Sequence, residues 1–168
     1  MSLTERIKSK DAKCAVVGLG YVGLPLLVEL ANAGYDAAGI DLDRSKVDSV
    51  NKGESYIPDV PTEELKELVK NGKIKATTDY SVLKEMDAVS ICVPTPLRKS
   101  REPDISYIVG SCLEVAKYLH KGQLVILEST TYPRTTEEIV LPILLGCFDP
   151  EETHISPERL EEKMNSSK

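Results

Sequence analysis

The sequence of 168 residues has no tryptophan, a single phenylalanine (Phe148) and only two histidines, His120 and His154. Aliphatic side chains must therefore build the core, and a zinc site is not expected. None of the four cysteines belongs to a CxxC pair. Cys14 and Cys92 stand in apolar runs typical of strands, where cysteine more often behaves as a small buried hydrophobe than as a ligand or disulfide partner. We predict structural thiols and no metal.

Clusters of basic residues are also lacking. The 21 Lys and Arg are scattered among 27 Asp and Glu, which gives a net charge of −6. Nucleic acids and anionic membranes attract clustered basic residues, so neither partner is expected. No apolar run approaches the roughly 20 residues that span a bilayer. The opening residues, MSLTERIKSKDAK, contain no apolar stretch like that of a secretory signal. The expected location is therefore the cytoplasm.

The length suits one domain with a sizeable core and is short for two. Apolar runs typical of strands alternate with segments of helical periodicity, and the strand-like runs are continuously apolar. This combination predicts an α/β fold, a Rossmann-like doubly wound parallel sheet with helices on both faces. The predicted strands are 13–17, 36–41, 73–76, 87–93 and 124–127, and the longer predicted helices are 21–33, 62–70, 104–119 and 136–145.

Four local expectations follow from side-chain chemistry. Ser45 is suited to cap a short helix that runs through Asn51, and Asp104 to cap the helix that follows it. That later helix should bury one stripe, formed by Ile108, Cys112, Val115 and Leu119. The run 124–127 (LVIL) predicts a buried strand.

One motif indicates chemistry. The sequence G-L-G-Y-V-G places glycines at Gly18, Gly20 and Gly23, and Asp41 follows 18 residues after the last of them. A GxGxxG is weak by itself, but here it follows a predicted strand, opens a predicted helix and precedes an acid near the expected distance of about 20 residues. Gly18 permits a tight turn, Gly20 lets a pyrophosphate approach the backbone, and Gly23 lets the helix pack on the strand. We favour a dinucleotide site over a turn without a ligand.

Asp41 also bears on which dinucleotide is bound. A carboxylate at the end of the second strand accepts hydrogen bonds from ribose hydroxyls and repels a 2′-phosphate, which favours NAD. Arg44 follows closely and could favour NADP, although a solvated residue at the start of a helix is the more frequent role for such an arginine.

Two polar clusters follow later strands. They are Val93–Pro96 after the fourth strand and Glu128–Pro133 after the fifth. Ligands of open α/β sheets bind beyond the carboxyl ends of the strands, so these hydroxyls are candidates to face a cofactor. Pro, Ser and Thr are equally common in ordinary turns. Spacing alone does not decide between the two interpretations.

The ordered set VVGLGYVGLPL, GIDLD, NKGES, CVPTPL, ESTTYPRTTEE and SPER resembles the UDP-glucose/GDP-mannose dehydrogenase family, a family of nucleotide-sugar 6-dehydrogenases. Within it, ESTTYP and SPER are most similar to the branch that acts on UDP-N-acetylhexosamines. The resemblance is continuous over 13–138 and returns at 156–159. Members of this family oxidise the C6 alcohol of a nucleotide sugar to the acid, with two hydride transfers to NAD and a cysteine-bound thioester.

The resemblance implies roles for individual residues. It implies NAD contacts from the glycine loop, including Tyr21 and Val22 between the glycines, and from Asp41 at the ribose. It also places Thr95 and Thr130 beside the cofactor. The residues implied in catalysis are Thr130, near the reacting centre, and Glu158 of SPER, which corresponds to the family glutamate implicated in thioester hydrolysis.

The sequence also departs from the family pattern. The family's nucleophilic cysteine, its lysine and asparagine, and its nucleotide-sugar domain would all lie beyond Lys168. Arg134 stands where this branch usually has glycine, and LEEKM replaces the family's DPG after Arg159. We therefore expect an amino-terminal extension (1–12), an NAD-binding domain (13–150) and a diverged or frayed tail (151–168).

The function predicted from the sequence is that of the NAD-binding domain of a nucleotide-sugar 6-dehydrogenase of polysaccharide biosynthesis, a fragment unable to catalyse alone. The alternatives are a non-catalytic NAD-binding regulator or interaction module, and a complete NAD-dependent enzyme of another kind. The absent nucleophile weighs against the last of these. Expected partners are NAD(H), and a UDP-sugar once the missing domain is supplied. A homodimer is one of the assemblies open to the chain.

Overall fold

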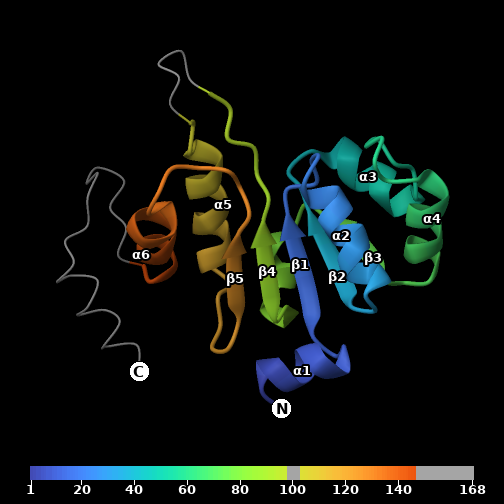
Figure 1. The fold of residues 1–168 in the computed structure, drawn as a ribbon, viewed down its shortest axis with the longest axis horizontal. Coiled ribbons are helices and arrows are strands. Elements are labelled where there is room, and N and C mark those ends of the chain that lie inside the picture. Colours follow the sequence, from blue (N-terminus) through green and yellow to red (C-terminus); the bar gives the residue numbers. More distant parts are fainter. Residues whose placement is uncertain (98–102, 147–168) are drawn as a thin grey trace. The chain divides into compact units, whose positions relative to one another are not determined.

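The computed structural model describes residues 1–97 and 103–146 (Figure 1). Internal contacts divide the chain into two units, which are described separately. The first unit comprises Met1–Pro94 and His120–Ser129. The second contains the described residues of Thr95–Leu119 and of the segment that begins at Thr130.

The first unit holds a five-stranded sheet in which every neighbouring pair is parallel. Its strands are β1 (Lys13–Val17), β2 (Asp36–Ile40), β3 (Ile74–Thr77), β4 (Ala88–Ile91) and β5 (Leu124–Leu127), in the order β3-β2-β1-β4-β5. The order reverses between β1 and β4, which is the point where such sheets bind ligands. Val17 pairs with both Ile40 and Ile91, so β1, β2 and β4 end level with one another. The predicted Rossmann-like α/β fold is confirmed.

An aliphatic core packs three helices against this sheet. They are α2 (Gly23–Asn32), α3 (Arg44–Lys52) and α4 (Thr62–Lys70). No aromatic side chain of the described residues is among the fully buried members of the core. Its fully buried members from the helices include Leu24, Leu27, Val50 and Leu65. Burial of one such side chain contributes roughly 1.5–3 kcal/mol. The short 3₁₀ helix η1 (Tyr80–Glu85) leads into β4.

The helix α1 (Leu3–Ser9) is tied to the end of the sheet where the strands begin. A reciprocal capping box joins Ser2 and Glu5 at its start. Further along, the Arg6 guanidinium pairs with Asp87, whose other oxygen accepts the Lys13 N–H at 2.7 Å. Residues 1–12, predicted as an extension, therefore include a docked helix, although the boundary at residue 12 stays a prediction.

The second unit contains α5 (Ser106–Ala116), the π-helical segment η2 (Thr136–Val140) and α6 (Leu141–Leu144). The helix α5 contacts both η2 and α6. Pro142 is the second residue of α6, which follows η2 without a break. Of the stripe predicted for α5, Ile108, Cys112 and Val115 are fully buried. Leu119 is not, because the helix ends at Ala116.

Two other local expectations were wrong. Asp43 caps α3, since its carboxylate accepts the Ser45 N–H at 2.9 Å, and Ser45 lies inside the helix. Both residue types are good caps, and the helix begins two residues earlier than a cap at Ser45 predicts. The strand β5 was expected to be buried, but Leu124 is 41% exposed. Within the described sheet β5 is an edge strand paired only with β4.

Asp104 acts close to its predicted place. Its Oδ1 accepts the Ser106 N–H at 3.0 Å, and α5 begins at Ser106.

Among the residues that the structure describes, no helix combines the length and hydropathy needed to cross a bilayer.

Candidate functional site

The glycine loop connects β1 to α2 and contains two positions where the fold itself demands glycine. Gly18 has φ +92°, and a Cβ there would lie 2.7 Å from the carbonyl oxygen of Cys92. A Cβ on Gly23 would lie 1.7 Å from the carbonyl oxygen of Gly18. Neither position tolerates a side chain, because backbone atoms occupy the space. These two glycines close the turn and bring α2 against the loop.

Gly20 differs from its two neighbours in the motif. A Cβ built on Gly20 meets no atom within 4 Å, and its φ lies outside the left-handed region. The described protein therefore supplies no steric or conformational reason for glycine at this position.

The amino terminus of α2 has no side-chain cap. Val22 occupies the N-cap without a side-chain hydrogen bond, and the first turn carries no acidic residue. Tyr21 and Val22 are 76% and 60% exposed. The amides at the start of a helix carry partial positive charge and favour an anion, so this end suits a phosphate group.

Asp41 follows β2 and reaches the glycine loop. Its Oδ2 accepts the Leu19 N–H at 2.8 Å and lies 3.2 Å from the Lys46 ammonium, and its Oδ1 accepts the Asp43 N–H at 2.9 Å. The side chain is 11% exposed. A carboxylate oxygen can accept two hydrogen bonds, so Oδ1 keeps capacity for a further donor such as a hydroxyl. The structure thus brings together the predicted ribose acid and the predicted pyrophosphate loop.

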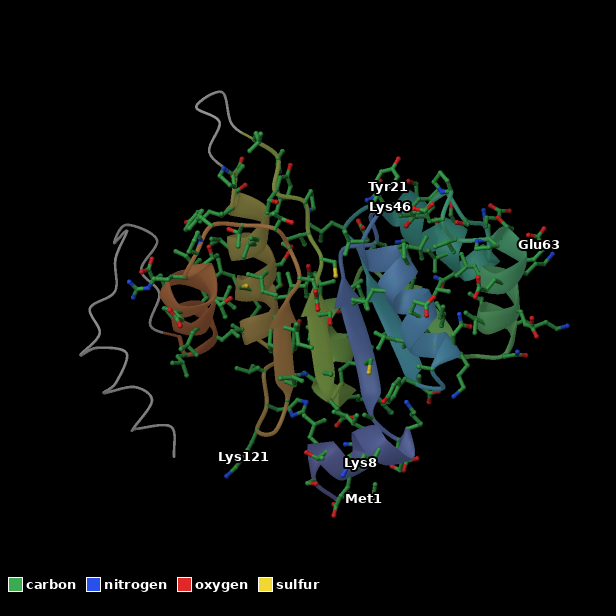
Figure 2. The ribbon with its side chains drawn as sticks, viewed as in Figure 1. Met1, Lys8, Tyr21, Lys46, Glu63 and Lys121 are labelled. Carbon is green, nitrogen blue, oxygen red and sulfur yellow. The ribbon has the colours of Figure 1, made fainter. Side chains whose placement is uncertain are left out.

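Sequence reasoning missed two residues of this cluster. Lys46 contacts Asp41 from the first turns of α3, whereas Arg44 is the exposed first residue of that helix. The Tyr56 hydroxyl donates to the Leu19 carbonyl at 2.7 Å. Figure 2 shows Tyr21 and Lys46 at the end of the first unit opposite Lys8 of α1. Lys46 stands five residues after Asp41, and this short separation could have suggested the contact. No sequence pattern pointed to Tyr56.

Electrostatics keep the Tyr56 hydroxyl in its donor form. Burial raises the pKa of Tyr56 well above its usual value, and the nearby carboxylates of Asp41 and Asp43 raise it further. The side chain is half-buried. A phenol with a raised pKa stays protonated through the neutral range and donates to the carbonyl.

The predicted threonines meet in the second unit. The Thr95 hydroxyl donates to the Thr130 carbonyl at 2.7 Å, which joins the two polar clusters at one point. Within the first unit, the Ser129 hydroxyl donates to the Val93 carbonyl at 2.8 Å. That Thr95 and Thr130 border the cofactor stays a prediction.

Arg134 adopts a backbone conformation that glycine adopts without strain. Its φ is +71°, one of two positive values among the described non-glycine residues. Its guanidinium lies 3.1 Å from Glu138 and 3.5 Å from Glu137 on the following turn. The conformation gives a physical reason for the glycine that the resemblance implies here.

The described cysteines are buried thiols, as predicted for Cys14 and Cys92. Burial raises the pKa of Cys92 to about 11 and that of Cys112 to about 12, and it also raises the pKa of Cys14. Such thiols are protonated at neutral pH and are poor nucleophiles. Glu158, predicted to be catalytic, lies outside the described residues. Within residues 1–97 and 103–146, no group of His, Cys, Asp and Glu could hold a metal ion.

These features define a dinucleotide-binding domain of the dehydrogenase type. They are the strand β1, the glycine loop with two sterically required glycines, the uncapped helix α2 and the acid that follows β2. The sequence model of the NAD-binding domain of the UDP-glucose/GDP-mannose dehydrogenase family matches residues 12–166. The chain belongs to this family, and the domain's cofactor is NAD.

Relatives identify the branch. A UDP-N-acetyl-D-mannosamine dehydrogenase of Pyrococcus horikoshii is 37% identical over 88% of this chain and 36% of its own length. A protein of the same name from Campylobacter jejuni is 41% identical over 76% of this chain and 31% of its own length. The predicted resemblance to the UDP-N-acetylhexosamine branch is confirmed. The chain spans about a third of the length of these relatives.

Solved structures agree. The NDP-N-acetyl-D-galactosaminuronic acid dehydrogenase of Methanosarcina mazei is 34% identical, with a TM-score of 0.76 over 88% of this chain and 34% of its own. A GDP-mannose dehydrogenase, described in a ternary complex, is 30% identical to this chain, with a TM-score of 0.75. The match covers 80% of this chain and 32% of the dehydrogenase chain.

Proposed function

We propose that the loop Gly18–Gly23 and Asp41 form the NAD(H) site of a nucleotide-sugar 6-dehydrogenase. The observation that carries the proposal is the contrast within the motif. The fold requires Gly18 and Gly23, whereas Gly20 faces open space. A pyrophosphate lying over Gly20 and the amino terminus of α2 supplies the missing reason for a glycine there, because any side chain would occupy the ligand's place.

Asp41 completes the site at the ribose. Its Oδ1 has capacity for a ribose hydroxyl, and the carboxylate disfavours a 2′-phosphate. The Lys46 ammonium offsets part of the negative charge of the cluster through its contact with Asp41. NAD remains the preferred cofactor because the carboxylate, rather than the ammonium, stands directly against the loop. Tyr21 and Val22, both exposed, offer apolar surface beside the pyrophosphate.

Bound NAD would supply the hydride acceptor for oxidation of a sugar alcohol. The residues proposed around the reacting end are Thr95 and Thr130, which hydrogen-bond to each other, and Glu158. A glutamate suits activation of water for thioester hydrolysis. Among the residues that the structure describes, Cys14, Cys92 and Cys112 are buried and do not suit nucleophilic catalysis. We therefore expect this chain alone to give no NADH from UDP-sugars. The UDP-sugar substrate, a homodimer, a cytoplasmic location and a role in polysaccharide biosynthesis are parts of the same proposal.

Calorimetric titration with NADH and NADPH tests the function, with Gly20→Val as the matched control. The expected result is saturable NADH binding, weaker NADPH binding and no binding to a folded Gly20→Val. Absence of NADH binding to the unsubstituted, folded chain would overturn the proposal, and so would an unchanged affinity of Gly20→Val.

A further inference from the structure

Leu19, between the first two glycines of the motif, is held at three points. Its N–H donates to Asp41 Oδ2 at 2.8 Å, and its carbonyl oxygen accepts the Tyr56 hydroxyl at 2.7 Å. Its side chain is fully buried, against Gly39 of β2. The two hydrogen bonds come from segments that are far from the loop in sequence, the end of β2 and the connection between α3 and α4.

A planar trans peptide transmits each of these contacts to a neighbouring group. The carbonyl of one residue and the N–H of the next point in opposite directions, and the described chain has no cis peptide bond. When Tyr56 holds the Leu19 carbonyl, it therefore also fixes the direction of the Gly20 N–H. In the same way Asp41, by holding the Leu19 N–H, fixes the Gly18 carbonyl that lies against Gly23.

We propose that Tyr56 is a positioning residue for the dinucleotide, whose hydroxyl holds the Leu19–Gly20 peptide so that the Gly20 N–H points to the pyrophosphate. This inference rests on the proposed function. Gly20 has no side chain that could pack against the protein and restrain its amide. A Cβ built on Gly20 would have no atom within 4 Å. Without Tyr56 the Leu19–Gly20 peptide loses the hydrogen bond that fixes its carbonyl, and binding must then order a donor that is otherwise ordered beforehand.

The test compares two tyrosines that each donate to a backbone carbonyl of the first unit. Tyr56→Phe removes the bond to Leu19, and Tyr35→Phe removes a bond of 3.0 Å to the Ile7 carbonyl at the other end of the sheet. Tyr56→Phe should weaken NADH binding by about three- to tenfold, the range for one neutral hydrogen bond. Tyr35→Phe should bind NADH as the unsubstituted chain does. Adenosine, which has no pyrophosphate, should bind all three proteins equally.

Equal NADH affinity of Tyr56→Phe and the unsubstituted chain would overturn the inference while leaving the proposed function intact. Loss of adenosine binding along with NADH binding would also overturn it, because it indicates general damage. If the unsubstituted, folded chain binds no NADH, the proposed function itself is overturned.

A measurement on the unsubstituted chain keeps the inference testable if Tyr56→Phe does not fold. The Gly20 amide should give a single sharp resonance without cofactor, because its peptide is already held. A Gly20 resonance broadened by conformational exchange before NADH is added contradicts the inference.

Discussion

The carbonyl oxygen of Gly18 lies 1.7 Å from the position that a Cβ on Gly23 would occupy. This close approach lets α2 begin directly against the turn that ends β1. The Leu19 N–H bond to Asp41 fixes the peptide that carries the Gly18 carbonyl. The geometry of the loop is therefore set by the protein before any ligand arrives.

The three glycines should respond differently to substitution. Gly23→Ala forces a methyl group into a backbone carbonyl and should lower the free energy of unfolding by about 1–3 kcal/mol or more. A Cβ at Gly20 has no protein atom within 4 Å, so Gly20→Val should unfold at nearly the temperature of the unsubstituted chain, yet lose NADH binding. Thermal melts followed by circular dichroism measure the first effect, and titration the second. A Gly23→Ala variant of unchanged stability contradicts the described loop.

Asp41→Ala should cost affinity and stability together. The variant removes the acceptor for a ribose hydroxyl and leaves the Leu19 N–H without its partner. NADH binding should weaken by about 1–3 kcal/mol, the scale for hydrogen bonds to a charged group. The discrimination against NADPH should shrink as well, since Lys46 then has no carboxylate beside it. Titration with both cofactors checks this, and undiminished discrimination would argue against the ribose role.

Arg134 offers a test of backbone strain away from the glycine loop. Arg134→Gly relieves a positive φ worth about 1–2 kcal/mol, but it adds freedom to the unfolded chain worth about 0.4–1 kcal/mol. The net change should be a rise in the free energy of unfolding of between zero and about 1.6 kcal/mol. Arg134→Val, a β-branched residue at the same φ, should be destabilised by roughly 1–3 kcal/mol. Urea denaturation of both variants measures the difference, and equal stabilities would refute the strain.

The buried cysteines predict both a reactivity and a pH dependence. With a pKa of about 11, Cys92 is only about one part in a thousand thiolate at pH 8, so it should resist a thiol reagent until urea unfolds the chain. A Cys147→Ser background restricts the readout to Cys14, Cys92 and Cys112. Rapid labelling of any of the three in the native state would show that it is misplaced.

The same raised pKa values fix the sign of the alkaline effect. The native state keeps protons that the unfolded thiols release above their ordinary pKa of about 8.5. Stability from this source is fully present below that pH and is lost as the pH rises toward the folded values of about 11 and 12 for Cys92 and Cys112. Urea denaturation at increasing pH measures the loss, and a Cys92→Ala variant should lose less stability over this interval.

The features that could be predicted from the sequence are local ones. The alternation of strands and helices, the glycine motif and the acid after the second strand all depend on spacing within a few tens of residues, and the structure has them where they were expected. Tyr56 could not be found in this way, because it meets Leu19 across 37 positions of sequence and only the folded chain brings them together. The exposure of Leu124 was missed for a related reason, since apolarity predicts a strand but does not tell that it lies at an edge.

The helix cap at Asp43 was missed because two good capping residues stand close together, and only the backbone decides between them. The roles of Thr95 and Thr130 followed from resemblance, and their hydrogen bond is consistent with one shared site without testing it.

The central claim, that NAD(H) lies over Gly20 at the amino terminus of α2, is tested most directly by amide resonances of the labelled chain during titration with NADH. The account predicts that the amides of Gly20, Tyr21 and Val22 shift in proportion to saturation, whereas that of Ile7 on α1 does not move. Saturable binding with these three loop amides unmoved would contradict it.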